Sequence, residues 1–575
     1  MAGSDHSTPS ARHVLGVLLA TLRPERGFFG LGVVYGVGIS VLSLATPIAV
    51  QVLINSVGYT GLTVPLVVLS LTLFGLLLAS GLLNALRVHL MEIFARRFYA
   101  RLTSEIALKA LYAQKPFFQD DGRGPLFNRY FDIMLVQKSA PVLVIGGFTV
   151  ILQAGVGFLL TAFYHPLFLA FNAVVIALIW VIWIVWGASA IKSSCELSDA
   201  KHRTAAWLQS LAASNGYFKS DQHIAYALRQ TDEVTGSYVT THRKHFRRHF
   251  SQTVAFLVLY AAASASLLGL GGWLVIVGQL TLGQLVAAEL VLSVAFFGVS
   301  QLGTYLNYFY DLCAACEELS RLDAIEQETP VGAELPARKS SELVFDGVRG
   351  TSRGRKAKFD LVIPSGRQLQ AVATNHSVQR LFTNLLKRFD EPRGGTLTLG
   401  GDDITSTDVL ALRRAVIVLD RPSLVEMSMR SYLNLANAAA NSSEMLEVLR
   451  CVELIDVIED LPNGLDTQLS STGWPLSQSE TMRLKLAAAM LARPRVLVLN
   501  QLFDTVPKRV LQNVFARMRG YGYEAPTVIV FTADEDDRGL DGYLLLDAEK
   551  QTLFDDYSSL QAALHTESSP VLEAD

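Results

Sequence analysis

Three long stretches of the chain are almost free of charged side chains. Residues 27–86 and 139–191 contain no Asp, Glu, Lys or Arg, and residues 249–310 contain only Glu289. Because an ionised side chain is costly in hydrocarbon, membrane helices largely exclude charge. Each stretch is long enough for two spans of about 20 residues. Candidate turns lie in the middle of the stretches, at residues 58–61, 164–166 and 278–283. The pattern predicts six membrane helices.

The segments between these stretches carry the basic side chains. Residues 87–138 and 192–248 contain lysines and arginines, whereas the three candidate turns contain none. By the positive-inside tendency, both segments and both chain termini are expected to be cytoplasmic. Helical arms of about 25 residues, at 1.5 Å per residue, would reach some 35 Å beyond the membrane. The helical pattern breaks near residues 120–122 and 215–216, where we expect the chain to turn back. The alternative is a pair of long soluble insertions.

The overall composition favours a membrane protein that does not bind nucleic acid. Hydrophobic residues make up 50% of the sequence, and the formal net charge of −3 gives no global attraction to nucleic acid. Residues 1–23 lack the features of a signal peptide, and residues 14–22 predict a short amphipathic helix at the membrane surface. The spacing of Cys313 and Cys316 could serve a metal, but two further ligands are missing, so helix packing is the favoured interpretation.

Glu289 is the one acidic residue in the three stretches, and it is a candidate for the membrane pathway. A carboxylate within the membrane is by default a hypothesis for substrate contact or proton exchange. It lies about two turns into the sixth predicted span. The alternative is therefore a wet structural position near the outer end of that span.

The pattern of hydrophobic and polar residues changes after residue 328. Short apolar runs then alternate with helical patterns, which is typical of an α/β domain. The predicted strands are residues 343–345, 370–373, 416–419, 496–499, 528–531 and 542–546. The predicted domains are an N-terminal tail with an interfacial helix (1–26), a six-span membrane domain (27–328), a linker (329–341), an α/β domain (342–560) and an acidic tail (561–575).

Four short sequence motifs follow one another in the second half of the chain. They are the sequences GGTLTLGGDDI at 394–404, LPNGLD at 461–466, LS at 476–477 and LARPRVLVLN at 491–500. This order resembles the nucleotide-binding domain of the ABC transporters, and residues 117–130 resemble the first coupling region of ABC exporters. The resemblance implies an ABC exporter half-transporter. Its fold class would be a membrane all-α six-helix exporter domain plus a cytoplasmic α/β ABC-ATPase-like domain.

The resemblance breaks down at the phosphate loop. The family has the pattern G-x-x-x-x-G-K-[ST], in which glycines let backbone N–H groups surround phosphate, a lysine neutralises it and a hydroxyl binds magnesium. This sequence starts that segment with Ala373 and places Val378, Gln379 and Arg380 at the last three positions. Val378 adds a side chain, Gln379 lacks the ammonium and Arg380 cannot bind a cation. We expect a degenerate phosphate loop.

The other catalytic positions are altered in the same direction. Asn500 stands where the family has the magnesium-binding Asp, and Gln501 stands where it has the catalytic Glu. Asp420 matches the family's metal-sensing Gln, and Ala533 matches its switch His. The signature LSGGQ is replaced by Leu476 followed by a degenerate segment, Ser477, Gln478, Ser479 and Glu480. We therefore expect no catalytic residues, no metal site and no cofactor, with Mg-ATP bound at most weakly.

The leading hypothesis is a transport protein of exporter fold whose transport is not driven by its own ATP hydrolysis. One alternative is the inert half of a heterodimeric ABC exporter that an intact partner powers. A second alternative is a membrane scaffold or regulator that does not transport. We expect a dimer, either homodimer or heterodimer, in a lipid bilayer of the bacterial inner membrane type, with an unknown substrate and no nucleic-acid partner.

Overall fold

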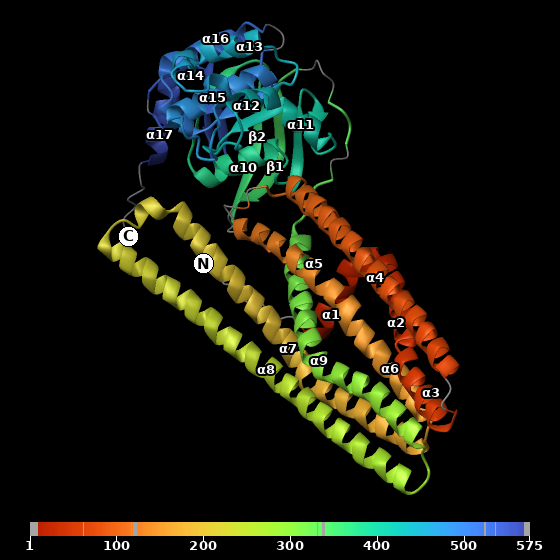
Figure 1. The fold of residues 1–575 in the computed structure, drawn as a ribbon. Coiled ribbons are helices and arrows are strands. Elements are labelled where there is room, and N and C mark those ends of the chain that lie inside the picture. The colour runs from red at the N-terminus through yellow and green to blue at the C-terminus, as the bar shows by residue number, and fades with distance from the viewer. Residues whose placement is uncertain are drawn as a thin grey trace, which may run out of the picture. The chain divides into compact units, whose positions relative to one another are not determined.

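The structure is a computed structural model that describes residues 10–60, 63–116, 118, 123–329, 332–335, 340–352, 354–521, 525–534 and 536–568. The chain divides into two compact units, Met1–Gln327 and Glu328–Asp575 (Figure 1). The first is helical and the second is an α/β unit.

The first unit is built from long helices. They are α1 (Ala11–Leu22), α2 (Arg26–Leu42), α3 (Ala45–Thr60), α4 (Thr63–Leu111), α5 (Asp132–Val142), α6 (Phe148–Ala162), α7 (Pro166–Ala213), α8 (Asp221–Ile276) and α9 (Leu282–Ser320). Short helical turns are η1 (Arg23–Glu25), η2 (Gly124–Phe131), η3 (Leu143–Gly147), η4 (Asn215–Tyr217) and η5 (Arg321–Ala324). Within the described ranges, six helical segments are long and apolar enough to cross a membrane. The predicted six-helix membrane domain is confirmed as a fold class.

Several of these helices are far longer than a membrane is thick. Helix α8 has 56 residues, α4 has 49 and α7 has 48. At 1.5 Å per residue α8 spans about 84 Å, whereas the hydrocarbon core is only about 30 Å thick. Figure 1 shows α7 and α8 running side by side, well past the level at which the shorter α6 begins. The predicted extension of the helices beyond the membrane is therefore confirmed.

The predicted turns fall close to the observed ones. The chain turns between α6 and α7 at residues 163–165, and between α8 and α9 at residues 277–281. The first predicted turn differs, because Gly58 to Thr60 continue α3, while Gly61 lies outside the described residues. The break at residues 215–216 is confirmed as η4, and residues 120–122 lie outside the described part. A break after Leu42, between α2 and α3, was not predicted.

Buried ion pairs join the charged ends of the helices in the first unit. Glu318 of α9 is 1% exposed, and its carboxylate accepts a hydrogen bond of 2.6 Å from Arg129 of η2. Arg321 binds Asp199 of α7 at 2.6 Å. Cys313 and Cys316 are fully buried in the same core, as packing residues. In the described residues no group of three or more His, Cys, Asp and Glu could hold a metal.

The second unit contains two sheets. The strands are β1 (Leu343–Ser352), β2 (Arg355–Ile363), β3 (Gln368–Ala373), β4 (Gly394–Leu399), β5 (Asp402–Asp403), β6 (Val416–Leu419), β7 (Val496–Leu499), β8 (Thr527–Phe531), β9 (Gly542–Leu546) and β10 (Gln551–Phe554). One sheet is antiparallel in the order β2-β1-β4-β5. The other has the order β10-β9-β3-β8-β7-β6, and its inner pairs are parallel.

Helices cover the larger sheet. They are α10 (His376–Leu386), α11 (Val409–Ala415), α12 (Met429–Ala436), α13 (Ser442–Cys451), α14 (Ile455–Glu459), α15 (Gln478–Ala492), α16 (Lys508–Arg519) and α17 (Tyr557–Ser568), with short turns η6 (Gly464–Asp466) and η7 (Gln501–Thr505). All four residues of β7 are buried, as expected for a parallel strand that is covered on both faces. The predicted α/β class of this unit is confirmed.

Two predicted boundaries in this unit need correction. Helix α17 continues past residue 560, so the predicted acidic tail does not begin there. The predicted linker 329–341 is partly attached to the α/β unit, because the Ala333 N–H donates to the Ser406 carbonyl at 2.9 Å. Residues 330–331 and 336–339 of the linker lie outside the described part.

Candidate functional site

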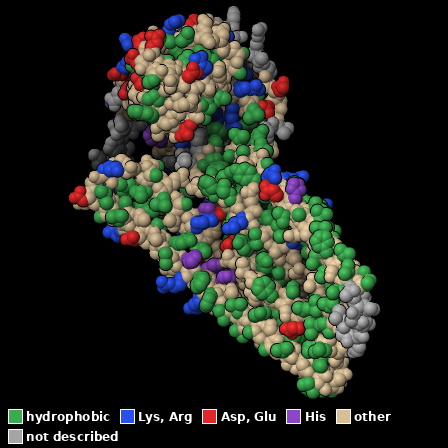
Figure 2. All heavy atoms as spheres, in the orientation of Figure 1, with side chains coloured by type: hydrophobic (Ala, Val, Ile, Leu, Met, Phe, Trp, Pro, Cys, Tyr) green, Lys and Arg blue, Asp and Glu red, His purple; other side chains and the backbone are tan. Residues whose placement is uncertain are grey.

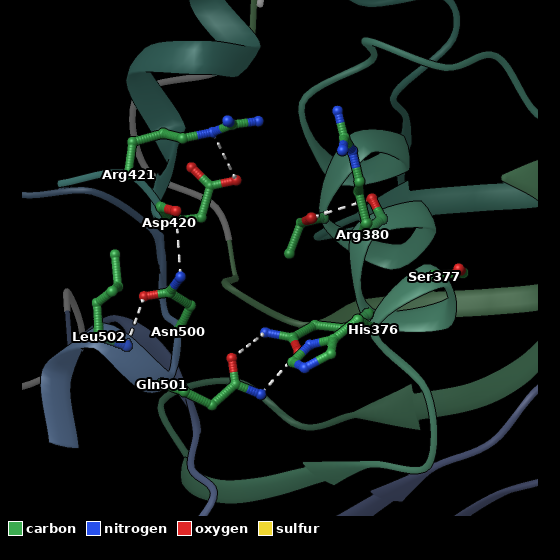
Figure 3. A pocket seen from close by; sticks show the side chains of 10 residues that line it. His376, Ser377, Arg380, Asp420, Arg421, Asn500, Gln501 and Leu502 are labelled. Carbon is green, nitrogen blue, oxygen red and sulfur yellow. Dashed lines mark hydrogen bonds and ion pairs between the residues drawn. The ribbon is translucent and has the colours of Figure 1, made fainter. Parts of the chain in front are cut away.

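A cavity of about 450 Å³ lies where three parallel strands of the α/β unit end (Figure 3). Helix α10 follows β3, Asp420 follows β6 and Asn500 follows β7, so the chain meets the cavity at the carboxyl ends of the strands. In open α/β sheets this edge is where ligands bind. The cavity is lined by His376, Ser377, Gln379, Arg380, Thr383, Asp420, Arg421, Asn500, Gln501 and Leu502.

Asn375 caps the helix that begins at the cavity. Its side-chain oxygen accepts a hydrogen bond of 2.8 Å from the Ser377 N–H, in the manner of an N-cap. Its carbonyl accepts from the Val378 N–H at 3.0 Å and from the Gln379 N–H at 3.2 Å. Only Thr374 and Asn375 separate α10 from Ala373, the last residue of β3. The backbone donors at the start of α10 are therefore bonded within the chain.

Val378, which was expected at a glycine position of the phosphate loop, packs in the hydrophobic core. Its side chain is 3% exposed and belongs to the cluster that contains Phe345, Phe382 and Phe531. The rings of Phe345 and Phe382 stack at 5.0 Å between centroids. The position is thus occupied by a packing residue that ties α10 to the sheets.

Gln379 and Gln501 form a reciprocal pair of amides. The Gln379 Nε2 donates to Gln501 Oε1 at 3.1 Å, and the Gln501 Nε2 donates to Gln379 Oε1 at 2.8 Å. Gln379 is 7% exposed. The pair joins α10 to the end of β7 across the cavity, and it was not predicted. The sequence did hold a signal for this pair, because a glutamine stands at the expected lysine position of the phosphate loop and another at the expected glutamate position after β7.

Asn500 holds the segment after β7 in place. Its Oδ1 accepts from the Leu502 N–H at 3.1 Å, so it caps η7, and its Nδ2 donates to the Asp420 carbonyl at 3.1 Å. The Asp420 carboxylate lies 3.9 Å from Arg421. Figure 3 shows Arg380 and Arg421 extending toward the same side of the cavity from α10 and from the segment after β6.

Ala533, which was expected at the position of the switch histidine, lies just after β8. Its N–H donates to the Asp504 carboxylate at 3.0 Å. The same carboxylate binds Arg538, which is 8% exposed and also pairs with Asp534 at 3.1 Å. This network was not predicted, because its residues belong to no motif and lie in separate loops.

The segment that was expected to correspond to the ABC signature caps the start of α15. Ser477 and Glu480 form a capping box at the start of α15, with the Ser477 N–H donating to Glu480 at 2.8 Å. Gln478 is the first residue of α15, and the Ser479 hydroxyl donates to the Thr505 carbonyl at 2.9 Å. The Glu480 carboxylate also lies 3.8 Å from Arg483. The Glu480 carboxylate therefore interacts with the N-terminus of α15.

Lys485, further along α15, is a buried cation that the sequence did not reveal. It is 7% exposed, and its Nζ donates to the carbonyls of Arg421 and Ser423 at 2.6 Å each. Burial lowers the pKa of Lys485 to about 8. The side chain ties α15 to the loop that borders the cavity.

Glu289, the membrane-pathway candidate, is half-buried in α9 of the other unit. Its Oε1 accepts a hydrogen bond of 3.1 Å from the Ser293 hydroxyl one turn later. Its Oε2 is buried and has no hydrogen-bond partner among the described residues. The structure brings Glu289 together with a local hydroxyl of the same helix.

Comparisons with known proteins agree with this architecture. Residues 29–200 match the family described as the ABC transporter transmembrane region. The chain is 24% identical over 513 residues to the ABC multidrug transporter mdr2 of Aspergillus fumigatus, covering 84% of this chain and 63% of that protein. It is 23% identical over 419 residues to the ATP-dependent lipid A-core flippase of Desulfotalea psychrophila, covering 70% of this chain and 72% of the flippase.

The chain spans less than two thirds of the length of mdr2, and less than half of several other curated relatives. Among solved structures it is similar to a bacterial Atm1-family ABC exporter with ATP bound, with a TM-score of 0.80 and 18% identity. That match covers 96% of this chain and 100% of the exporter. The protein is therefore an integral membrane protein with the fold of an ABC exporter, in which a helical unit similar to the ABC transporter transmembrane region precedes an α/β unit of ABC-ATPase-like fold.

Proposed function

We propose that this chain is an exporter-fold transport protein whose ABC-type domain neither holds Mg-ATP productively nor hydrolyses it. It works as a dimer in a membrane of the bacterial inner membrane type, with both termini in the cytoplasm. Transport is then driven by something other than its own ATP hydrolysis. The observation that carries the proposal is the set of hydrogen bonds made by Asn375 and by the pair Gln379 and Gln501.

The backbone at the start of α10 supports the proposal first. A phosphate loop leaves its N–H groups free to surround phosphate. Here the N–H groups of Ser377, Val378 and Gln379 are bonded to Asn375. Releasing them would cost about 1 kcal/mol for each hydrogen bond. Val378 would also have to leave the core, where it is 3% exposed.

The missing charges support the proposal second. Productive Mg-ATP needs a cation on the phosphates, a carboxylate for the metal and a group that orients water. Gln379, Asn500 and Gln501 supply amides at these positions, and the amides are used in hydrogen bonds to one another or to the backbone. Loss of one charge-stabilising group commonly slows an enzyme about a hundredfold. The residues therefore do not fit Mg-ATP.

ATP hydrolysis by the purified full chain in lipid nanodiscs tests this proposal. We expect phosphate release with Mg-ATP to stay at the level of empty nanodiscs, while an intact ABC exporter prepared in the same way turns over. Binding of a fluorescent ATP analogue in the presence of magnesium should be weak for the same reason. Turnover on the order of 1 per second, typical of a working enzyme, would contradict the proposal.

The composition of the dimer needs its own measurement. Mass analysis of the intact complex, extracted from its native membrane, would show whether two copies of this chain or two different chains are present. Two identical chains fit transport without ATP hydrolysis. A second, catalytically intact half-transporter would instead assign the energy to that partner.

Glu289 is the proposed proton carrier of the membrane domain. It carries the one acidic side chain in the three apolar stretches, and its Oε2 is buried without a partner among the described atoms. Proton flux into proteoliposomes should fall in Glu289→Gln, whereas Ser293→Ala, which removes only the hydrogen bond to Oε1, should retain most of it. Equal flux in the wild type and Glu289→Gln would rule out this role.

A further inference from the structure

A second cavity, of about 760 Å³, lies in the helical unit between the start of α5 and the later part of α7. It combines charged and apolar walls. Its lining residues are Asn128, Phe131, Asp132, Met134, Leu135, Lys138, Lys201, His202, Ala205 and Gln209. Figure 2 shows charged and histidine side chains gathered over the region of α5, α7 and α9, next to hydrophobic ones.

The charged wall is built around the buried carboxylate of Asp132. Asp132 is 2% exposed, and its two oxygens bind Lys201 at 2.7 Å and His202 at 2.6 Å. The carboxylate is therefore fully engaged by donors from α7. This arrangement fixes Lys201 at the cavity wall, where its side chain remains 47% exposed.

Lys138 adds a second cation to the same cavity. It is exposed and, among the described residues, forms no ion pair within 4 Å. The other nearby carboxylate, Asp311 of α9, interacts electrostatically with Lys138 and Lys201 but is not part of the lining, and it accepts a hydrogen bond from Asn307 at 3.3 Å. The lining contains two lysines and one carboxylate. Its charge suits an anion.

The other wall of the cavity is apolar. Phe131 is 62% exposed and Met134 is 51% exposed, and both precede the charge-free stretch that begins at residue 139. Exposed apolar side chains beside a cavity commonly mark a place where a ligand binds. A carbon chain laid against them would place its charged end within reach of the lysines.

We propose that this cavity binds an amphipathic anion, a carboxylate or phosphate with an apolar body, as the substrate of transport. The inference rests on the proposed transport function, because it names the substrate class of that function. Lys138 and Lys201 hold the anionic group, and Phe131 and Met134 contact the apolar body. The anion is either a free amphipathic acid or the headgroup of an anionic lipid.

Binding of radiolabelled decanoate to the full chain tests the proposal, in nanodiscs of neutral phosphatidylcholine. We expect saturable binding that Lys138→Met weakens about tenfold, the value of one charge-assisted hydrogen bond. Lys219→Met is the matched control, since Lys219 is an exposed lysine outside the cavity lining, and should leave binding unchanged. Lys138→Glu should weaken decanoate binding further.

Further probes separate the outcomes. Competition by phosphatidylglycerol that is lost in Lys138→Met would identify a lipid headgroup as the source, and its absence would identify a free acid; both support the anion site. Equal decanoate binding by wild type and Lys138→Met, or equal binding of decyltrimethylammonium, would overturn it. The assay contains no nucleotide, so ATP hydrolysis by this chain would contradict the proposed function without changing these results.

Discussion

Gln379 of α10 and Gln501 after β7 exchange two hydrogen bonds, at 3.1 and 2.8 Å, across the cavity at the edge of the parallel sheet. Each amide donates one hydrogen bond to the other and accepts one from it. We call this uncharged pair, Gln379 and Gln501, the clasp; it joins a helix to the end of a strand. A lysine and a glutamate at these positions would carry charge. The clasp joins the start of α10 to the segment after β7.

The clasp predicts a coupling energy between the two glutamines. Gln379→Ala and Gln501→Ala should each destabilise the protein by about 1 kcal/mol, because each leaves a partly buried amide without its partner. The double variant should lose less than the sum of the two. Thermal unfolding of the four proteins forms a double-mutant cycle. Gln478→Ala, an exposed glutamine at the start of α15, is the control and should unfold like the wild type. Strict additivity would contradict the clasp.

The cap on α10 predicts a second stability effect. Asn375→Ala removes the side-chain acceptor of the Ser377 N–H and should destabilise the protein by about 1 kcal/mol. Asn375→Asp retains an acceptor and adds a favourable charge at the helix N-terminus, so it should unfold near the wild-type temperature. If Asn375→Ala unfolds at the same temperature as Asn375→Asp, the cap does not stabilise α10.

The helical unit and the parallel strands could be predicted because their patterns are local. The charge-free stretches indicated six spans, and all six predicted strands correspond to observed ones. Strand β2 was missed, because its alternation of Arg355, Lys356 and Lys358 with buried Ala357 and Phe359 is an exposed-face pattern with many charges. The break after Leu42 was missed too, although Pro47, the third residue of α3, was a signal for it, because proline has no N–H to donate to the Ser43 carbonyl.

The residues at the expected motif positions of the α/β unit can be named from the sequence, but their contacts could not be predicted. A motif fixes which residue stands at a position, and so identified Gln379, Asn500 and Gln501. It does not show that Asn375 bonds the N–H groups of α10, because that depends on where the helix begins. Arg538 and Lys485 lie outside the motifs, and only the folded chain brings them to the loops beside the cavity.

Removing Arg538 should lower the stability of the protein more than removing an arginine that forms an exposed ion pair. Arg538→Met should leave Asp504 and Asp534 without their shared cation, and breaking a buried pair costs about 3 kcal/mol. Arg430→Met breaks the pair with Asp466, in which both side chains are largely exposed, and should have no measurable effect. Thermal unfolding of both variants tests the contrast. Equal unfolding temperatures for the two would show that the Arg538 network does not stabilise the domain.

Lys485 predicts how stability responds to alkaline pH. Burial lowers its pKa to about 8 in the folded protein, whereas an unfolded lysine has a pKa of about 10.4. Between these two values the unfolded chain holds a proton that the folded Lys485 has lost, so its contribution to stability rises with pH. Below about pH 8 the lysine is protonated in both states and contributes no slope.

The measurement is the change in unfolding temperature between about pH 7 and about pH 9.5, compared between wild type and Lys485→Met. All other groups titrate in both proteins, so the difference isolates Lys485. The wild type should gain stability relative to Lys485→Met as the pH rises. Lys508→Met, in which the lost lysine is half-exposed and paired with Asp536, should follow the wild-type slope. If unfolding temperature depends on pH in the same way in the wild type and in Lys485→Met, the buried lysine keeps an ordinary pKa. Its Nζ would then donate to the carbonyls of Arg421 and Ser423 as a fully charged ammonium over the whole pH range.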